Sequence, residues 1–171
     1  VTIRPGTLKD IVNVVELWEQ FMGEHDCAVV KKNPKLKEYT IKRKDAKTRF
    51  KKFLTKLIET EEGYLSLAED NGKIVGYNLA RIKDEIPIFK LEKMGQIADL
   101  YVQKDYRGQR LSSKLRDSAI KWFKNNNIDV MSITVYPDNP HAHSIYKKWG
   151  FMDFKTEIME NDKDNQHKRQ Q

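Results

Sequence analysis

The stretch from Gly95 to Tyr136 limits the fold of this 171-residue chain more than any other feature. It reads as a strand over 95–102, a turn, a helix over 111–125 with apolar residues on one side, and a strand over 130–136. Two strands joined by a helix of this length are most simply parallel, with a right-handed crossover. The last strand shows almost no polar alternation, which is typical of a position near the centre of a sheet. We therefore expect a mixed α/β fold.

The rest of the chain adds an antiparallel half to this unit. Asp70-Asn71-Gly72 separates two apolar runs and is a strong hairpin signal, and Thr7 and Asp10 have the spacing of a capping box. The other expected elements are strands over 2–4, 64–69, 73–81 and 151–159, and helices over 8–22, about 50–58 and 140–149. Together they predict one domain over 1–159, with six to seven strands and about four helices, and a polar tail over 160–171.

Composition excludes several classes of protein. Hydrophobic residues make up 39% and charged residues 33%, which is enough apolar material for one core and too much for a disordered chain. The single cysteine, Cys27, cannot form an internal disulfide, and no set of His and Cys has the spacing of a zinc site. No apolar run approaches the ~20 residues that cross a bilayer, and no secretory signal is visible. We expect a cytoplasmic protein that holds no metal and enters no membrane.

The net charge of +7 is unevenly distributed. The segment 31–56 carries twelve basic residues and two acidic ones, so it contributes +10 and the rest of the chain −3. Such a block is either a solvated helix face or a surface that attracts nucleic acid, phosphate-bearing ligands or acidic proteins.

A turn that suits an anion joins the strand over 95–102 to the next helix. The first turn of a helix has N–H groups without internal partners and a partial positive charge. Gly108 allows a ligand to approach the backbone closely, and Arg107 and Arg110 add forked donors suited to phosphate oxygens. The alternative is an ordinary strand–helix turn with a helpful glycine, and these residues alone leave both interpretations open.

At this turn the chain resembles a known family, the GNAT N-acetyltransferases. Their acetyl-CoA signature is similar to Leu100-Tyr101-Val102 and then Tyr106-Arg107-Gly108-Gln109-Arg110-Leu111-Ser112-Ser113-Lys114-Leu115. Their second signature is similar to Asn139, Ala142, Tyr146 and Gly150-Phe151, and the order of elements agrees across nearly the whole chain. The resemblance implies a single-domain GNAT-like fold that takes acetyl-CoA as co-substrate. The implied binding residues are Leu100, Tyr101, Val102, Arg107, Gly108, Gln109, Arg110, Leu111, Ser112, Ser113, Asn139 and Tyr146.

Two positions depart from the family's first signature. Arg110 and Ser112 stand where small residues are usual. Ser112 is a mild change, whereas Arg110 adds a long side chain where the pyrophosphate would pass. The Arg110 side chain either swings out to solvent or pairs with a CoA phosphate. The backbone donors remain in either case, since every residue except proline has one.

The resemblance also implies roles in the reaction. Tyr146 would be the general acid that protonates the departing thiolate, and Asn139 would contact the pantetheine arm; their other readings are a half-buried core tyrosine and a helix N-cap. The pantetheine would run beside Leu100 and Val102 like an added strand, with an oxyanion donor near the Leu100 N–H. Strict alternation would place Gln96, Ala98, Leu100 and Val102 on one face of the strand, opposite Ile97, Asp99 and Tyr101.

The general base is not assigned by the signatures. Polyamine-acetylating relatives carry Glu-Asp before the apolar triplet, where this chain has Ala98-Asp99. Asp99 is therefore a candidate that acts through water, or a strand-end aspartate held in a hydrogen bond. Gln96 could orient a water but cannot accept a proton at neutral pH.

His25, His141 and His143 offer little catalytic signal. His25-Asp26-Cys27 is interpreted as surface, because no partner residue appears at ligand spacing. His141 and His143 are two apart on a short helix and do not share a face.

The sequence thus predicts an N-acetyltransferase that moves the acetyl group of acetyl-CoA to a primary amine by direct attack in a ternary complex. The +10 block would repel a polycationic amine, so a protein lysine, an N-terminus or an amine in an acidic context fits better than a polyamine or aminoglycoside. The alternatives are a catalytically silent acyl-CoA-binding module and a basic nucleic-acid-binding protein. The latter is disfavoured because no reading motif is present. The oligomeric state is left open between a monomer and a homodimer.

Overall fold

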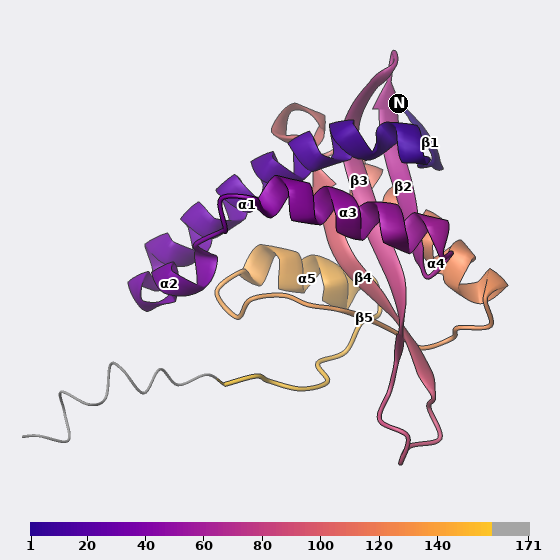
Figure 1. Ribbon diagram of the computed structural model, residues 1–171. Coiled ribbons are helices and arrows are strands. Elements are labelled where there is room, and N and C mark those ends of the chain that lie inside the picture. Colours follow the sequence, from indigo (N-terminus) through magenta and orange to yellow (C-terminus); the bar gives the residue numbers. More distant parts are fainter. Residues whose placement is uncertain (159–171) are drawn as a thin grey trace, which may run out of the picture. The chain divides into compact units, whose positions relative to one another are not determined.

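A computed structural model describes residues 1–158 of the chain (Figure 1). The residues fall into two compact units, Val1–Asp138 and the segment that starts at Asn139, and each is described by itself. The first unit contains β1 (Thr2–Pro5), η1 (Leu8–Asp10), α1 (Ile11–Lys32), η2 (Pro34–Leu36), α2 (Lys37–Thr40), α3 (Ala46–Glu59), β2 (Gly63–Asp70), β3 (Lys73–Asp84), β4 (Lys93–Val102), η3 (Lys104–Tyr106), α4 (Leu111–Asn125) and β5 (Met131–Ile133). The second contains α5 (Pro140–Lys148).

One mixed sheet organises the first unit, in the order β1-β2-β3-β4-β5. The first three pairings are antiparallel and β4 pairs with β5 in parallel, as the strand–helix–strand pattern predicted. Helices α1 and α3 lie side by side on one face of the sheet and α4 covers the other (Figure 1). The mixed α/β prediction is confirmed.

The core has two parts, one on each face of the sheet. Under α1 and α3 the buried residues include Val14, Leu54, Leu67 and Tyr77. Under α4 they include Leu115, which is fully buried. The apolar stripe of each helix therefore faces the sheet, which holds the strands in place.

The strand count differs from the prediction, with five strands in the described residues instead of six to seven. Residues 151–158 form no strand, because no neighbouring strand pairs with them in the part of the chain described. Residue 159 and the predicted tail over 160–171 lie outside that part. Strand β5 covers only Met131–Ile133, where its pairing with β4 ends. It lies at the edge of the described sheet, so the position near the centre that its apolar sequence predicted is wrong.

Helix α1 ends at Lys32, ten residues beyond the predicted end, and the first three residues of the predicted helix form η1 instead. Gly23 does not interrupt it, and Lys31 and Lys32 complement the negative end of the helix dipole. The helix stops at Asn33 because Pro34 follows, and a residue before proline avoids helical geometry. The additional four-residue α2 raises the number of α-helices to five in residues 1–158. Among the helices of residues 1–158, none combines the length and the apolar character of a membrane span.

The predicted capping box is present and belongs to a larger network. The Asp10 carboxylate accepts from the Thr7 N–H at 2.8 Å and from two nitrogens of Arg4, at 2.8 and 3.0 Å. Arg4 also donates to Glu69 at 2.5 Å. The hydrogen bonds from Arg4 are the main reason that the pKa of Asp10 lies well below its usual range.

We expect Asp10→Asn to lower the free energy of unfolding at pH 7 by about 2 kcal/mol, because a charged hydrogen bond is lost and Arg4 keeps its charge. The native pKa is depressed, so the stabilisation is present above the unfolded pKa of about 4 and is lost as the pH falls towards the native value. Urea unfolding at pH 7 and pH 3 measures the effect. A difference that did not shrink at pH 3 would contradict this reading.

Candidate active site

A β-bulge in β4 sets the geometry of the site. Asp99 lies opposite Leu79, but Ile97 lies opposite Ala80, so Ala98 is an extra residue without a cross-strand partner. The strict alternation expected from the sequence is therefore wrong across this point. Leu100 and Val102 face α4. Gln96, which lies opposite Arg81, shares the face of Asp99 beneath α1.

Beyond the bulge, one edge of β4 is open. The parallel ladder with β5 stops at Ile97 and Ile133. The Gln103 N–H donates to Val75 of β3, so alternation directs the backbone groups of Leu100 and Val102 away from β3. The Val102 carbonyl follows this pattern, since it accepts from Arg107 Nε at 2.8 Å. The Leu100 N–H thus faces an edge with which no strand of the described residues pairs, and it could bond an added strand or an oxyanion.

A buried amide lies next to this edge. Asn78 is the cross-strand partner of Leu100 and is fully buried. Neither its Nδ2 nor its Oδ1 has a hydrogen-bond partner in the residues described. Such a group calls for a water or a ligand atom. Sequence reasoning missed Asn78, because an asparagine inside an apolar strand carries no signal of its own.

The predicted anion turn leads into α4. Gly108 has φ of +81° and Arg110, the N-cap of α4, has φ of +58°. No side chain caps this helix, so the N–H groups of its first turn, Leu111, Ser112 and Ser113, remain donors. Residues 107–110 are exposed. The Leu111 side chain is buried, so only its backbone can contact a ligand.

Arg110 adopts a left-handed conformation that glycine prefers, which explains why a small residue suits this position. We expect Arg110→Gly to raise the free energy of unfolding by about 0.5–1 kcal/mol, because the strain of a Cβ in this region slightly exceeds the entropy that glycine costs. Chemical denaturation measures it. Gly108→Ala is the matched control: its Cβ would meet nothing within 4 Å, so an expected loss of about 1 kcal/mol reports backbone strain alone. A loss of stability in Arg110→Gly would contradict the strain argument.

Arg107 does not stand free to meet a phosphate. Its Nη2 donates to Glu24 of α1 at 2.8 Å, and its guanidinium lies 5.6 Å from the centre of the Tyr101 ring. Tyr101 also donates its hydroxyl to Glu24 at 2.8 Å. Burial opposes ionisation of Glu24, but these two hydrogen bonds and the positive charges of Arg107 and Lys104 together outweigh it and lower the pKa of Glu24. Glu24 therefore joins α1 to the turn, and it was not anticipated because its partners lie far away in the sequence.

Asp99 has the properties of a base. It is half-buried on the α1 face and accepts a hydrogen bond from Tyr77 at 3.1 Å. Burial raises its pKa to about 6, against the opposing influence of the Tyr77 hydroxyl and the charges of Arg81 and His25. A carboxylate with this pKa is ionised at neutral pH and still basic enough to accept a proton from an amine.

The sequence predicted that His25 lies on the surface, and the structure shows that it is largely covered. Its side chain is 23% exposed and its ring packs against Tyr136 at 4.9 Å and Phe21 at 5.8 Å. Asp26 Oδ1 lies 3.4 Å from His25 Nδ1. Only Cys27 of the three is exposed as predicted. The four-residue spacing of Phe21 and His25 on α1 was the available sequence signal.

The second unit holds the other predicted residues. Asn139 caps α5, since its Oδ1 accepts from the Ala142 N–H at 3.1 Å. Tyr146 is half-buried, with ring centres of Trp149 and Phe151 at 5.5 and 6.4 Å, and burial raises its pKa. Residues 1–158 contain no cluster of three or more His, Cys, Asp or Glu able to hold a metal ion.

Comparison with known proteins decides the family. The model of the acetyltransferase (GNAT) family matches residues 16–151. The chain belongs to this family. The GNAT chain is 30% identical over 145 residues to an uncharacterised N-acetyltransferase of Archaeoglobus fulgidus, which covers 84% of this chain and 88% of that protein. It is 27% identical to another from Methanocaldococcus jannaschii, over 88% of this chain but only 60% of the relative's length.

Solved structures agree with the fold. The crystal structure of a predicted acetyltransferase with acetyl-CoA from Clostridium acetobutylicum has a TM-score of 0.72 at 19% identity, covering 94% of this GNAT chain and 95% of that chain. The aminoglycoside N-acetyltransferase AAC(6')-Iy in complex with CoA also has a TM-score of 0.72, at 15% identity, covering 94% of this chain and 93% of the other. At these identities the likeness concerns the fold.

Proposed function

We propose that this GNAT chain transfers the acetyl group of acetyl-CoA to a primary amine within a ternary complex. Family membership supports the reaction class. The single observation that supports the site is the unpaired half of β4 beyond the Ala98 bulge, next to the uncapped start of α4. The pantetheine arm of the thioester can bind along the unpaired half of β4 like an added strand. The pyrophosphate can then accept hydrogen bonds from the backbone amides at the start of α4.

Asp99 is the proposed base. A lysine-type amine has a pKa of about 10.4 and must lose a proton before it can attack. The Asp99 carboxylate takes that proton, directly or through a water, and the amine nitrogen then attacks the acetyl carbonyl carbon. The Leu100 N–H is the proposed donor to the oxygen that becomes negative, a contribution of roughly 3–4 kcal/mol for one such donor.

Tyr146 is the proposed acid. When the carbon–sulfur bond breaks, the electron pair leaves with sulfur, and the Tyr146 hydroxyl supplies the proton that yields free CoA thiol. The nitrogen, which bears a positive charge after its attack, loses its extra proton at this stage, and that proton, directly or through solvent, restores the Tyr146 hydroxyl. The Tyr146 phenol carries this proton at neutral pH, as any phenol with a pKa of about 10 or above does. Asn139 is proposed to contact the pantetheine arm as well as cap α5.

The binding set is proposed as predicted from the sequence, with two refinements. Arg107 acts mainly by joining the turn to Glu24, and Tyr101 and Leu111 contribute backbone atoms. A cytoplasmic location, a domain over 1–159 and a homodimer stay predictions.

Release of free thiol from acetyl-CoA tests the function, with neutral, acidic and polycationic amines as acceptors. We expect amine-dependent release. Acetyl-CoA binding without release for any acceptor would overturn the transferase in favour of the silent acyl-CoA-binding module.

A further inference from the structure

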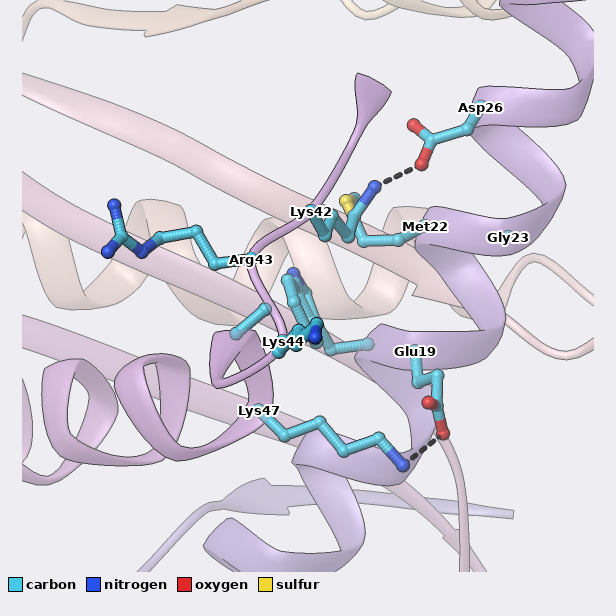
Figure 2. Close-up of a pocket in the computed structure, with 10 residues that line it drawn as sticks. Glu19, Met22, Gly23, Asp26, Lys42, Arg43, Lys44 and Lys47 are labelled. Atoms are coloured by element: carbon cyan, nitrogen blue, oxygen red, sulfur yellow. Dashed lines mark hydrogen bonds and ion pairs between the residues drawn. The ribbon is translucent and has the colours of Figure 1, made fainter. Parts of the chain in front are cut away.

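A cavity of about 310 Å³ opens between α1 and the start of α3 (Figure 2). Trp18, Met22 and Ala46 give it an apolar lining, and Trp18 is held by stacking on Phe50 at 4.4 Å. Four cationic residues line the rest, namely Lys42, Arg43, Lys44 and Lys47. We call this the α1–α3 pocket.

The pocket has more positive than negative charge. Glu19 pairs with Lys47 at 2.6 Å and Asp26 pairs with Lys42 (Figure 2). Lys44 has no recorded partner in the residues that the structure describes, and Arg43 reaches only Asp45, at 3.5 Å. Two of the four cations are therefore available to an incoming anion.

The exposed face of α3 continues this surface. Lys51, Lys52 and Lys56 are exposed and line a second hollow with Thr48, Thr55 and Glu59. No carboxylate in residues 1–158 is recorded within ion-pair distance of these three lysines. Lys52 and Lys56 are four residues apart on the helix, and like charges at this spacing repel each other. Within the part of the chain that the structure describes, no carboxylate offsets this repulsion.

The pocket also adjoins the proposed reaction centre. Asp26, which pairs with Lys42 in the pocket, lies 3.4 Å from His25 through its other oxygen. The His25 ring packs on Phe21, which packs on Tyr101, and Tyr101 packs on Tyr77, the hydrogen-bond donor to Asp99. A series of side-chain contacts therefore connects the pocket with the proposed base.

We propose that the α1–α3 pocket and the lysine face of α3 (Lys51, Lys52 and Lys56) bind an acidic polypeptide segment that carries the acceptor amine. The inference rests on the proposed function and names its substrate class. The apolar floor suits the stem of a glutamate or aspartate side chain, and Lys44 and Arg43 suit its carboxylate. A peptide fits better than nucleic acid, because the apolar floor of Trp18, Met22 and Ala46 suits the aliphatic stem of an acidic side chain, whereas a phosphate backbone is polar throughout. Polyamines would be repelled.

Two peptides with the same acceptor amine, one followed by four glutamates and one by four glutamines, test the proposal. We expect the wild-type KM to be at least tenfold lower for the glutamate peptide, and expect this preference to fall towards one in Lys51→Glu/Lys52→Glu/Lys56→Glu. The control Lys73→Glu/Lys90→Glu/Lys121→Glu makes the same change in net charge at exposed sites elsewhere. It should keep the preference. Circular dichroism verifies that both variants fold.

A second readout separates this proposal from the enzyme assignment. Fluorescence anisotropy measures binding of the labelled glutamate peptide without acetyl-CoA, and we expect its affinity to fall at least tenfold in the α3 variant alone. Equal KM values for the two peptides, a preference lost equally in the control, or tighter binding of a single-stranded RNA would overturn the acidic-peptide surface. If the peptide binds through the lysine face but no thiol is released, the proposed peptide-binding surface is supported and the proposed acetyltransferase function is overturned.

Discussion

Asp99→Asn is expected to lower kcat/KM for acetyl transfer by about 10²–10⁴-fold, the usual range for removal of a general base. The amide cannot accept a proton at neutral pH, but it keeps the size of the side chain and can still accept the hydrogen bond from Tyr77. Acetyl-CoA affinity should change little, since the carboxylate acts on the amine. Steady-state kinetics of thiol release with one acceptor, together with calorimetry of acetyl-CoA binding, measure the two effects.

The pH dependence of activity tests independently whether Asp99 is the general base. Because the pKa of Asp99 is raised to about 6, wild-type activity should rise through an acidic limb near that pH as the carboxylate ionises. The limb should disappear in Asp99→Asn. A limb that persisted in the variant, or a loss of less than threefold, would show that another group is the base.

Stability provides the control for this variant. The native pKa of Asp99 lies above its unfolded value of about 4, so the folded chain keeps a proton that the unfolded chain releases. The stability due to Asp99 is present below pH 4 and is lost as the pH rises through about 6. Asp99→Asn removes this penalty, so its melting temperature at pH 7.5 should equal or exceed that of the wild type. Lost activity in a stable protein then reports chemistry.

Tyr146→Phe is expected to lower kcat by about 10²-fold or more while the dissociation constant of acetyl-CoA stays nearly constant. The change removes one hydroxyl and keeps the ring, so the packing against Trp149 and Phe151 is retained. The proton that the departing thiolate needs is no longer supplied, and the transition state loses more than the bound ground state. Single-turnover thiol release separates this step from product release.

A substitution of Trp149 tests whether packing explains the result. Trp149→Phe alters the ring that Tyr146 packs against but leaves the hydroxyl in place, so kcat should fall far less. An equal loss of kcat in both variants would show that Tyr146 contributes by packing and not as a proton donor. A Tyr146→Phe enzyme with normal kcat would remove the phenol from the mechanism.

Local patterns predicted β4 and α4 correctly because their signals are local, whereas β5 is shorter than predicted and lies at the edge of the described sheet. Apolar spacing and the turn at Gly108 were enough to place β4 and α4. The helix between β4 and β5 also predicted correctly that these two strands are parallel. The Ala98 bulge was not predictable in this way. A bulge is defined by the register with β3, which no single residue encodes.

In the candidate site too, local sequence predicted some features, and others arise only from contacts that the fold creates. Asp99 was identified from its place before the apolar triplet, yet its raised pKa comes from burial under α1, which only the fold creates. Arg107 was expected to face a phosphate, but Glu24 engages it from 83 residues away. His25 was expected on the surface, but α1 turns it towards Tyr136. In each case the partner is distant in sequence, and single-residue patterns do not reveal it.

Titration calorimetry of the protein with acetyl-CoA tests whether the backbone donors from Gly108 to Ser113 and the open edge of β4 hold this thioester. We predict saturable binding of one acetyl-CoA per chain, accompanied by a higher melting temperature. Absence of both the binding heat and the melting shift at millimolar acetyl-CoA would contradict the claim.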